Sequence, residues 1–163
     1  MIEPRDNPTT AQRVMVLQII TAAMVLGVVM FGLVSVFALN SFQQPPAGQI
    51  VSIVAAGFAL LAFVMHLFVP EAVAASVLKQ SSASNRVDKL AAAYQTRHIV
   101  KLAILEGAAF FALVAGTVEH QLWTLAIAVA LVIVMLAEFP TQTRLNHWTE
   151  SRQESSGGQP LDS

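Results

Sequence analysis

The chain has 163 residues, of which 55% are hydrophobic and only 12% charged, and its mean hydropathy of +0.63 is too high for a water-soluble globule of this length. The formal net charge of -1 and the nine scattered basic residues exclude a phosphate-tracking face, so we expect no nucleic-acid partner. The chain contains no cysteine, which excludes disulfides, thiolate metal ligands and cysteine nucleophiles.

Four apolar runs follow one another along the chain, at about residues 14–39, 50–69, 99–118 and 122–139. Each run reaches or approaches the ~20 residues that a helix needs to cross ~30 Å of hydrocarbon. Segments of this length can span lipid only as helices, so the sequence predicts an all-α integral membrane protein with four transmembrane helices. The first run is too long for the apolar core of a signal peptide, and we interpret it as a retained helix.

The parts outside these runs are short. Pro70 is expected to end the second span, and residues 71–80 after it suit a short helix on the inner membrane surface. The third helix is expected to begin at about residue 86 and to continue without a break into the third run. Residues 1–140 therefore form the membrane domain. Residues 141–163 read as an amphipathic interfacial segment followed by a flexible tail.

The basic residues give the orientation. All of them fall on one side of the predicted membrane: Arg5, Arg13, Lys79, Arg86, Lys89, Arg97, Lys101, Arg144 and Arg152. The positive-inside rule makes that side cytoplasmic, so both termini and the central connection are predicted to be cytoplasmic. Trp123 and Trp148 are expected to anchor the chain at the two interfaces, where amphipathic rings are favoured.

The four runs form two hairpins of the same orientation. Each hairpin begins just after an arginine, Arg13 or Arg97, and ends near a proline, Pro70 or Pro140. This pattern fits a parallel internal duplication, and it also fits any two hairpins that obey the positive-inside rule. We expect a small four-helix bundle in either case.

Glu106 places a carboxylate in the middle of the third run, about 13 Å from its inner edge when the span is counted from Arg97. A carboxylate exposed to lipid costs several kcal/mol, so we expect Glu106 to face the bundle, a partner or water. His66, Gln18 and Thr21 lie at inner-leaflet depth as well. These four residues form the candidate polar site.

Three roles fit Glu106. It could bind a proton, a cation or a small polar ligand together with His66, which would make the chain a proton- or cation-coupled carrier. It could instead hydrogen-bond across helices to Gln18, Thr21 or His66 and hold the bundle together, or it could contact an oligomeric or other membrane partner. We favour a structural or partner-binding role, and we expect a homo-oligomer or a contact with another membrane protein. Lys101 and Glu138 are expected to extend to the headgroups.

Small residues predict where helices approach closely. Gly107, Ala108, Ala112 and Gly116 in the third run, and Gly27 in the first, let neighbouring helices come near one another. This distribution indicates that the third span is the central packing helix.

Motifs for chemistry are missing from the sequence. It contains no H-E-x-x-H, no phosphate-binding glycine loop and no G-x-S-x-G, so we expect no enzymatic activity. Haem binding between His66 and His98 is disfavoured because His98 lies at the membrane edge. We expect no metal and no cofactor.

A short stretch of the third run resembles the sequences of a known family. The stretch "AILEGAAFF", Ala103 to Phe111, followed by "FPT" after the last span, is similar to a family of uncharacterised bacterial four-span inner-membrane proteins. The resemblance covers the second half of the chain well and the first half only in pattern. It implies a multi-pass protein of the bacterial inner membrane, and it implies nothing about chemistry.

Overall fold

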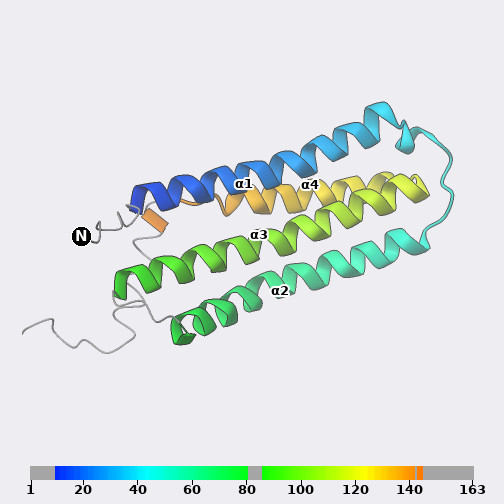
Figure 1. Cartoon of the computed structure of the whole chain (residues 1–163). Coiled ribbons are helices and arrows are strands. Elements are labelled where there is room, and N and C mark those ends of the chain that lie inside the picture. The colour runs from blue at the N-terminus through cyan, green and yellow to red at the C-terminus, as the bar shows by residue number, and fades with distance from the viewer. Residues whose placement is uncertain (1–9, 81–85, 142, 145–163) are drawn as a thin grey trace, which may run out of the picture.

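A computed structural model describes residues 10–80, 86–141 and 143–144. This part of the chain is helical and contains no β-strand (Figure 1). Its elements, in order, are α1 (Thr10–Leu33), the π-helical turn η1 (Val34–Ala38), the short 3-10 helix η2 (Ser41–Gln43), α2 (Ile50–Gln80), α3 (Arg86–Glu119) and α4 (Leu122–Ala137).

Successive helices run in opposite directions along one bundle axis (Figure 1). The starts of α1 and α3 and the ends of α2 and α4 lie together at one end. We call this the basic end, because the described Lys and Arg residues belong to these segments. The connection from residue 39 to 49 and the turn at His120–Gln121 lie at the other end, which we call the turn end.

The helix α3 is the centre of the bundle. It packs against α1, α2 and α4, and its longest contact is with α2. The helices α1 and α2 follow each other in the chain but lie on different sides of α3 (Figure 1). The first two predicted spans are therefore joined by a turn without forming a packed pair. The small residues of α3 favour this central position because they admit neighbouring helices on several sides.

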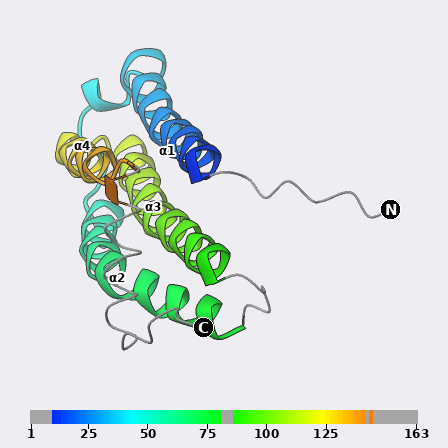
Figure 2. The ribbon, with the colours of Figure 1, turned by 90° about the vertical axis from the view of Figure 1, so that its left-hand side faces the viewer.

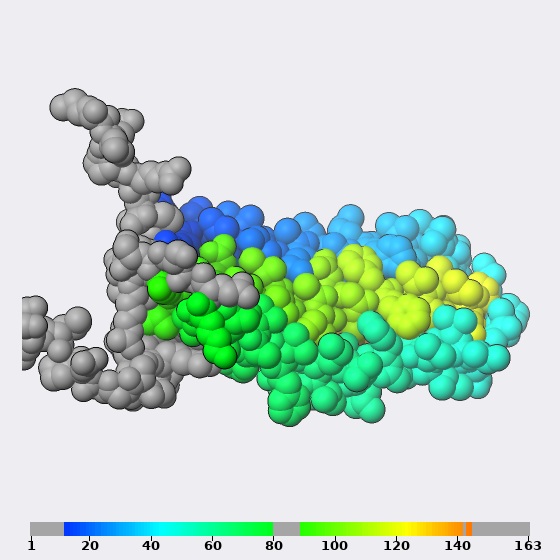
Figure 3. Space-filling model, turned by 60° about the horizontal axis from the view of Figure 1, so that its bottom comes forward, coloured from blue at the N-terminus to red at the C-terminus, as the bar shows by residue number. Residues whose placement is uncertain are grey.

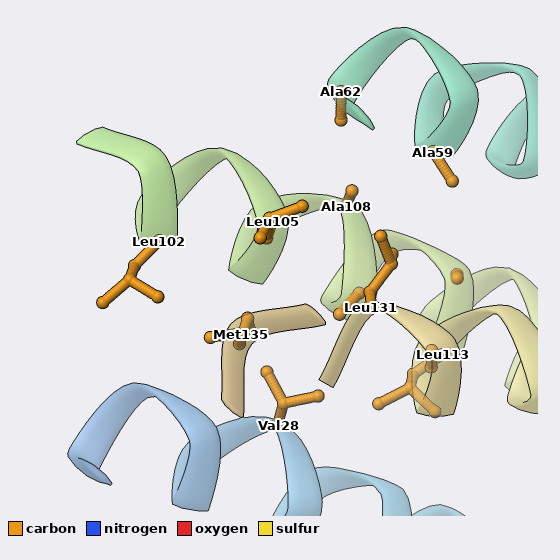
Figure 4. Packing of buried hydrophobic residues seen from close by; sticks show 12 residues of the cluster. Val28, Ala59, Ala62, Leu102, Leu105, Ala108, Leu113, Leu131 and Met135 are labelled. Atoms are coloured by element: carbon orange, nitrogen blue, oxygen red, sulfur yellow. The ribbon is translucent and has the colours of Figure 1, made fainter. Parts of the chain in front are cut away.

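The core is a narrow apolar seam between α3 and its neighbours (Figure 4). Leu102, Leu105 and Leu113 of α3 are almost fully buried. Ala59 and Ala62 of α2 contribute small side chains that face α3. The helix α3 also contributes the fully buried Ala108, Ala109 and Ala112, and the other helices contribute Val28 of α1 and Met135 of α4.

Three of the four α-helices in the described part of the chain are long and apolar enough to cross a membrane: residues 12–38, 50–79 and 89–119. The helix α4 differs from the expected span of 122–139, because it has 16 residues and ends at Ala137. At about 1.5 Å per residue it is about 24 Å long, which is less than the ~30 Å of a typical hydrocarbon core.

The expected break at Pro70 is absent. The helix α2 continues through Pro70 to Gln80, so residues 71–80 belong to it and do not form a separate surface helix. Proline removes one intrahelical hydrogen bond and pushes against the preceding turn, which bends a helix without having to end it. Figure 2 shows the C-terminal part of α2 turned away from the rest of that helix.

The start of α3 at Arg86 matches the residue at which the sequence places the third helix. Trp123 lies in the first turn of α4, at the turn end, and is 39% exposed. Trp148 and the predicted interfacial segment beyond Arg144 lie outside the described residues.

Candidate functional site

A cluster of polar groups at the basic end is built around Glu138, the residue that follows α4. Lys101 of α3 donates from Nζ to Glu138 Oε1 at 2.9 Å. His66 of α2 places Nε2 3.7 Å from the same oxygen, and Arg144 places Nη1 3.9 Å from Glu138 Oε2. The side chain of His66 is 3% exposed and that of Lys101 11%. Glu138 thus links α2, α3 and α4 at this end, which corrects the expectation that Lys101 and Glu138 extend separately to the surface.

A second set of polar contacts at the basic end joins α1 to the bundle. Thr21 Oγ1 lies 3.2 Å from His98 Nε2, and both residues are buried. The ring of His98 is stacked with that of Tyr94 one turn earlier. Gln18 donates from Nε2 to the carbonyl oxygen of Pro140 at 3.1 Å. These contacts tie α1 to α3 and to the chain after α4.

The turn end has a polar cluster of its own, centred on Glu119, the last residue of α3. Its carboxylate accepts hydrogen bonds from the backbone N–H groups of Val51 at 2.8 Å and Ser52 at 2.7 Å. These N–H groups lie in the first turn of α2, where a helix has no internal acceptors and favours negative charge. Glu119 therefore caps α2 from another helix.

The α3–α4 turn has a compact hydrogen-bonded geometry. His120 has a φ of 58°, and the N–H of Gln121 donates to the carbonyl oxygen of Gly116 at 3.2 Å, a Schellman-type closure. Gln121 Nε2 donates to the carbonyl oxygen of Gly48 at 2.7 Å. This end is thus locked by polar contacts between the two connections.

The two polar ends are separated by an apolar zone that contains one carboxylate. Lys101 and Glu119 lie 18 residues apart on α3, which corresponds to about 27 Å along a helix. Among the described residues, Glu106 is the one ionisable side chain between these levels. It lies about 7 Å from the level of Lys101 and about 20 Å from that of Glu119.

Glu106 lies beside α1 and is half-buried. A Cβ atom placed on Gly27 would lie 4.0 Å from Glu106 Oε1 and 3.7 Å from Phe110 Cζ, so both side chains rest over this glycine. Phe110 in turn packs edge-on against Phe31. Within the part of the chain that the structure describes, no hydrogen bond or ion pair involves the Glu106 carboxyl group.

The four residues of the predicted polar site do not come together. Thr21 contacts His98, Gln18 contacts Pro140, and His66 lies beside Lys101 and Glu138. Glu106 is one to two helical turns further into the apolar zone, where none of these three side chains bonds to it. The difference arises because the polar groups of neighbouring helices meet at the basic end and satisfy one another there.

The predicted packing residues divide into two groups. Ala108 and Ala112 have no exposed surface, and a Cβ atom on Gly116 would collide with Thr124 Oγ1. Gly27 is in ordinary van der Waals range of α3. Gly107, by contrast, is exposed, and a Cβ atom placed on it would meet no atom within 4 Å. It lies on a side of α3 that no other described helix covers, and it takes no part in packing among the described residues.

Two observations concern ligand sites in the described part of the bundle. No group of three or more His, Asp or Glu residues suited to a metal ion occurs among the described residues. A groove of about 370 Å³ between α1 and α4 is lined by apolar residues such as Val29, Val36, Val129 and Val132, with no hydrogen-bonding side chain in its lining. This groove has nothing to orient a polar ligand.

Sequence reasoning missed Glu119 as a helix cap and underestimated Glu138 and His98. Glu119 stands at the end of an apolar run, where a carboxylate looks like an ordinary exposed boundary residue. The sequence indicates the need for such a cap, because no Ser, Thr, Asp or Asn comes immediately before Ile50 and the first turn of α2 is left without a local cap.

Comparison of the chain with protein-family models, with curated proteins and with solved structures finds no match. Any functional proposal for this chain therefore rests on its own sequence and geometry.

Proposed function

We propose that this chain is a multi-pass protein of the bacterial inner membrane, without enzymatic activity, that acts by binding a partner within the bilayer. Both termini are cytoplasmic in this proposal. The observation that carries it is Glu106, a carboxyl group in the apolar zone with no partner among the described residues.

The surface of the bundle supports insertion into lipid. Large apolar side chains are exposed from Met15 on α1 to Leu39 just after η1, and from Ile50 to Phe68 on α2. Such a surface is unstable in water, and its natural solvent is hydrocarbon. The zone of about 27 Å between the two polar ends is close to the hydrocarbon thickness, so the short helix α4 crosses the same zone as α3.

The orientation follows from the charges of the two ends. The described basic residues belong to the basic end, whereas the turn-end connections contain none. By the positive-inside rule the basic end is cytoplasmic.

Partner binding explains Glu106 better than the other two roles. A carboxyl group that held the bundle together would have an acceptor or donor on another helix, and Glu106 has none among the described residues. A carrier would need polar groups that continue from Glu106 toward both ends. The core between Glu106 and Glu119 is instead built from residues such as Ala108, Ala112 and Leu113. A carboxyl group left unsatisfied at this depth favours a polar partner from outside the chain.

The proton- or cation-coupled carrier using Glu106 is the competing proposal, and carbodiimide labelling separates it from partner binding. The reagent reacts with protonated carboxyl groups in apolar surroundings, and mass spectrometry of the peptide that contains Glu106 locates the adduct. Labelling is compared in native membranes and in the purified monomer in detergent, with Glu106→Gln as the blank.

Partner binding predicts that Glu106 is shielded in native membranes and reactive in the purified monomer. Reactivity in native membranes that falls as the pH is raised would refute it and favour the carrier. Absence of reaction in both preparations would also refute it, because the carboxyl group would then be sealed within the bundle.

A further inference from the structure

A groove opens between the first turns of α1 and the facing part of α3, at the basic end of the bundle. Its volume is about 520 Å³, which is within the range of small-ligand sites. Its described lining consists of Gln12, Arg13, Met15, Val16, Ile19 and Gln95. Figure 3 shows the start of α1, in blue, beside the green residues of α3 at this end. Val14 and Leu17 of α1 and Tyr94 of α3 form a buried cluster at this level, so the two helices are held together beside the groove.

The lining of this groove changes from polar to apolar along the bundle axis. Gln12 and Arg13 lie at the end away from the apolar zone, and Ile19 lies six residues after Arg13, about 9 Å closer to that zone. Met15, Val16 and Ile19 are 61%, 47% and 58% exposed, so the apolar wall is accessible. The described lining contains no acidic side chain, and Arg13 gives the groove a positive charge. The groove therefore suits a ligand with a negative polar end and an apolar end.

The depth of the groove matches the headgroup layer of a bilayer. Gln95 lies six residues before Lys101 on α3, which places it about 9 Å beyond the level of Lys101, where the apolar zone ends. Headgroups add about 10–15 Å over both faces to the ~30 Å of hydrocarbon. The long side chain of Arg13 can extend along the helix toward this layer. The groove is therefore placed where the phosphate of a lipid and the glycerol ends of its acyl chains lie together.

We propose that this groove binds an anionic glycerophospholipid, with the phosphate at Arg13 and the glycerol ends of the acyl chains against Val16 and Ile19. A guanidinium has five N–H donors, so Arg13 can bind a phosphate and keep its other contacts within the chain. Gln95 adds amide N–H donors for the phosphate or for headgroup hydroxyls. This inference goes beyond the proposed function, because it uses the proposed membrane orientation and not the role of Glu106.

The combination of positive charge and exposed apolar surface distinguishes this groove from the other candidate sites. The groove between α1 and α4 has no hydrogen-bonding side chain in its lining, so it can contact acyl chains only. The cluster around Glu138 is charged, but Glu138 and Lys101 bond to each other and Lys101 is nearly buried. A free phosphate would gain nothing from the apolar wall beside Arg13, whereas a phospholipid uses both parts of the groove.

Native mass spectrometry of lipid binding tests this proposal. The purified full chain in detergent is titrated with a phosphatidylglycerol or with a phosphatidylcholine that has the same acyl chains, and the bound fraction is read from the mass of each complex. Arg13→Gln removes the charge of the groove. Lys79→Gln is the matched control, because it removes the same charge from an exposed position at the end of α2. Val16→Trp keeps the charge and fills the groove, and circular dichroism checks that each variant is folded.

We expect the unmodified protein to bind phosphatidylglycerol in preference to phosphatidylcholine. Arg13→Gln should weaken phosphatidylglycerol binding by about fivefold, the effect of one basic side chain at a lipid surface, and Lys79→Gln should leave it nearly unchanged. Val16→Trp should weaken the binding of both lipids, because the indole ring occupies the space of the glycerol region.

Equal binding of the two lipids by the unmodified protein would overturn the proposal. Equal losses in Arg13→Gln and Lys79→Gln would also overturn it, because the attraction would then be a general effect of surface charge, and unchanged binding in Val16→Trp would mean that the lipid lies elsewhere. Displacement of the lipid by an equimolar amount of glycerol phosphate would mean that the groove binds soluble phosphate esters instead. Carbodiimide labelling of Glu106 tests the proposed function separately, so a failure of one proposal is distinguishable from a failure of the other.

Discussion

Gly116 and Gly107 lie on the same helix but in opposite surroundings, and alanine at each position tests the packing of α3 directly. A Cβ atom on Gly116 would collide with Thr124 Oγ1, lie 2.9 Å from Phe42 Cε1 and lie 3.2 Å from the carbonyl oxygen of Gln121. The last of these atoms belongs to the backbone and cannot rotate away. On Gly107 the same atom would meet nothing within 4 Å.

The magnitude follows from two opposing effects. Alanine inside a helix is more stable than glycine by about 1 kcal/mol, and this gain applies at both positions. At Gly116 the added methyl group also overpacks the contact between α3 and α4, which costs about 1–3 kcal/mol and moves the start of α4. Because the helix gain is common to both positions, the two variants should differ by the overpacking cost of about 1–3 kcal/mol, with Gly107→Ala as the more stable protein.

Equilibrium unfolding of the monomer in mixed dodecylmaltoside and SDS micelles, followed by far-UV circular dichroism, measures this difference. Thr124→Ala in the Gly116→Ala background provides a further check, because it removes the atom with the closest contact and should recover part of the loss. Equal stability of Gly116→Ala and Gly107→Ala would show that α3 and α4 do not approach each other at Gly116, and the packing at the turn end would be wrong.

Two further predictions concern the polar ends. Glu119→Ala should speed amide hydrogen exchange at Val51 and Ser52 by about tenfold or more, because their N–H groups lose the acceptor that caps α2. Val118→Ala, which changes an exposed neighbour, is the control. Equal exchange rates in the two variants would contradict the cap. The Lys101–Glu138 pair should show a coupling free energy of about 1 kcal/mol in a double-mutant cycle of Lys101→Met and Glu138→Gln, measured by the same unfolding assay. Additive effects of the two substitutions would mean that the two groups do not stabilise each other.

The number of helices and the starts of α2, α3 and α4 followed from the sequence because they depend on local properties, whereas α1 begins at Thr10, four residues before the expected run. Length and apolarity alone identify the runs, and the lack of breakers between Arg86 and Glu119 predicts one long α3. The predicted end of the second helix at Pro70 was wrong because that prediction also used local information alone, and a local rule treats proline as the end of a helix. In α2 the tertiary contacts of residues such as Ala74, which is fully buried, carry the helix past it.

The pairing of polar side chains was harder to predict, because it depends on the rotation and depth of each helix. Glu106, His66, Gln18 and Thr21 share a leaflet, and sequence alone gives no angle between them. A rotation of one helix by a single residue moves a side chain by about 100°, enough to exchange one neighbour for another. In the structure, Thr21 contacts His98 and His66 lies beside Glu138. Glu106 has no hydrogen-bond partner among the described residues.

Among the described residues, the polar side-chain contacts between helices lie at the two ends of the bundle, where water and headgroups also reduce the cost of charge. Glu138 and Glu119 each join different helices and are satisfied inside the chain. Glu106 shares neither property, since it makes no hydrogen bond or ion pair to another helix among the described residues and lies in the apolar zone. A carboxyl group that has no hydrogen-bond partner among the described residues and is costly in lipid supports the proposal that this chain binds a partner within the bilayer.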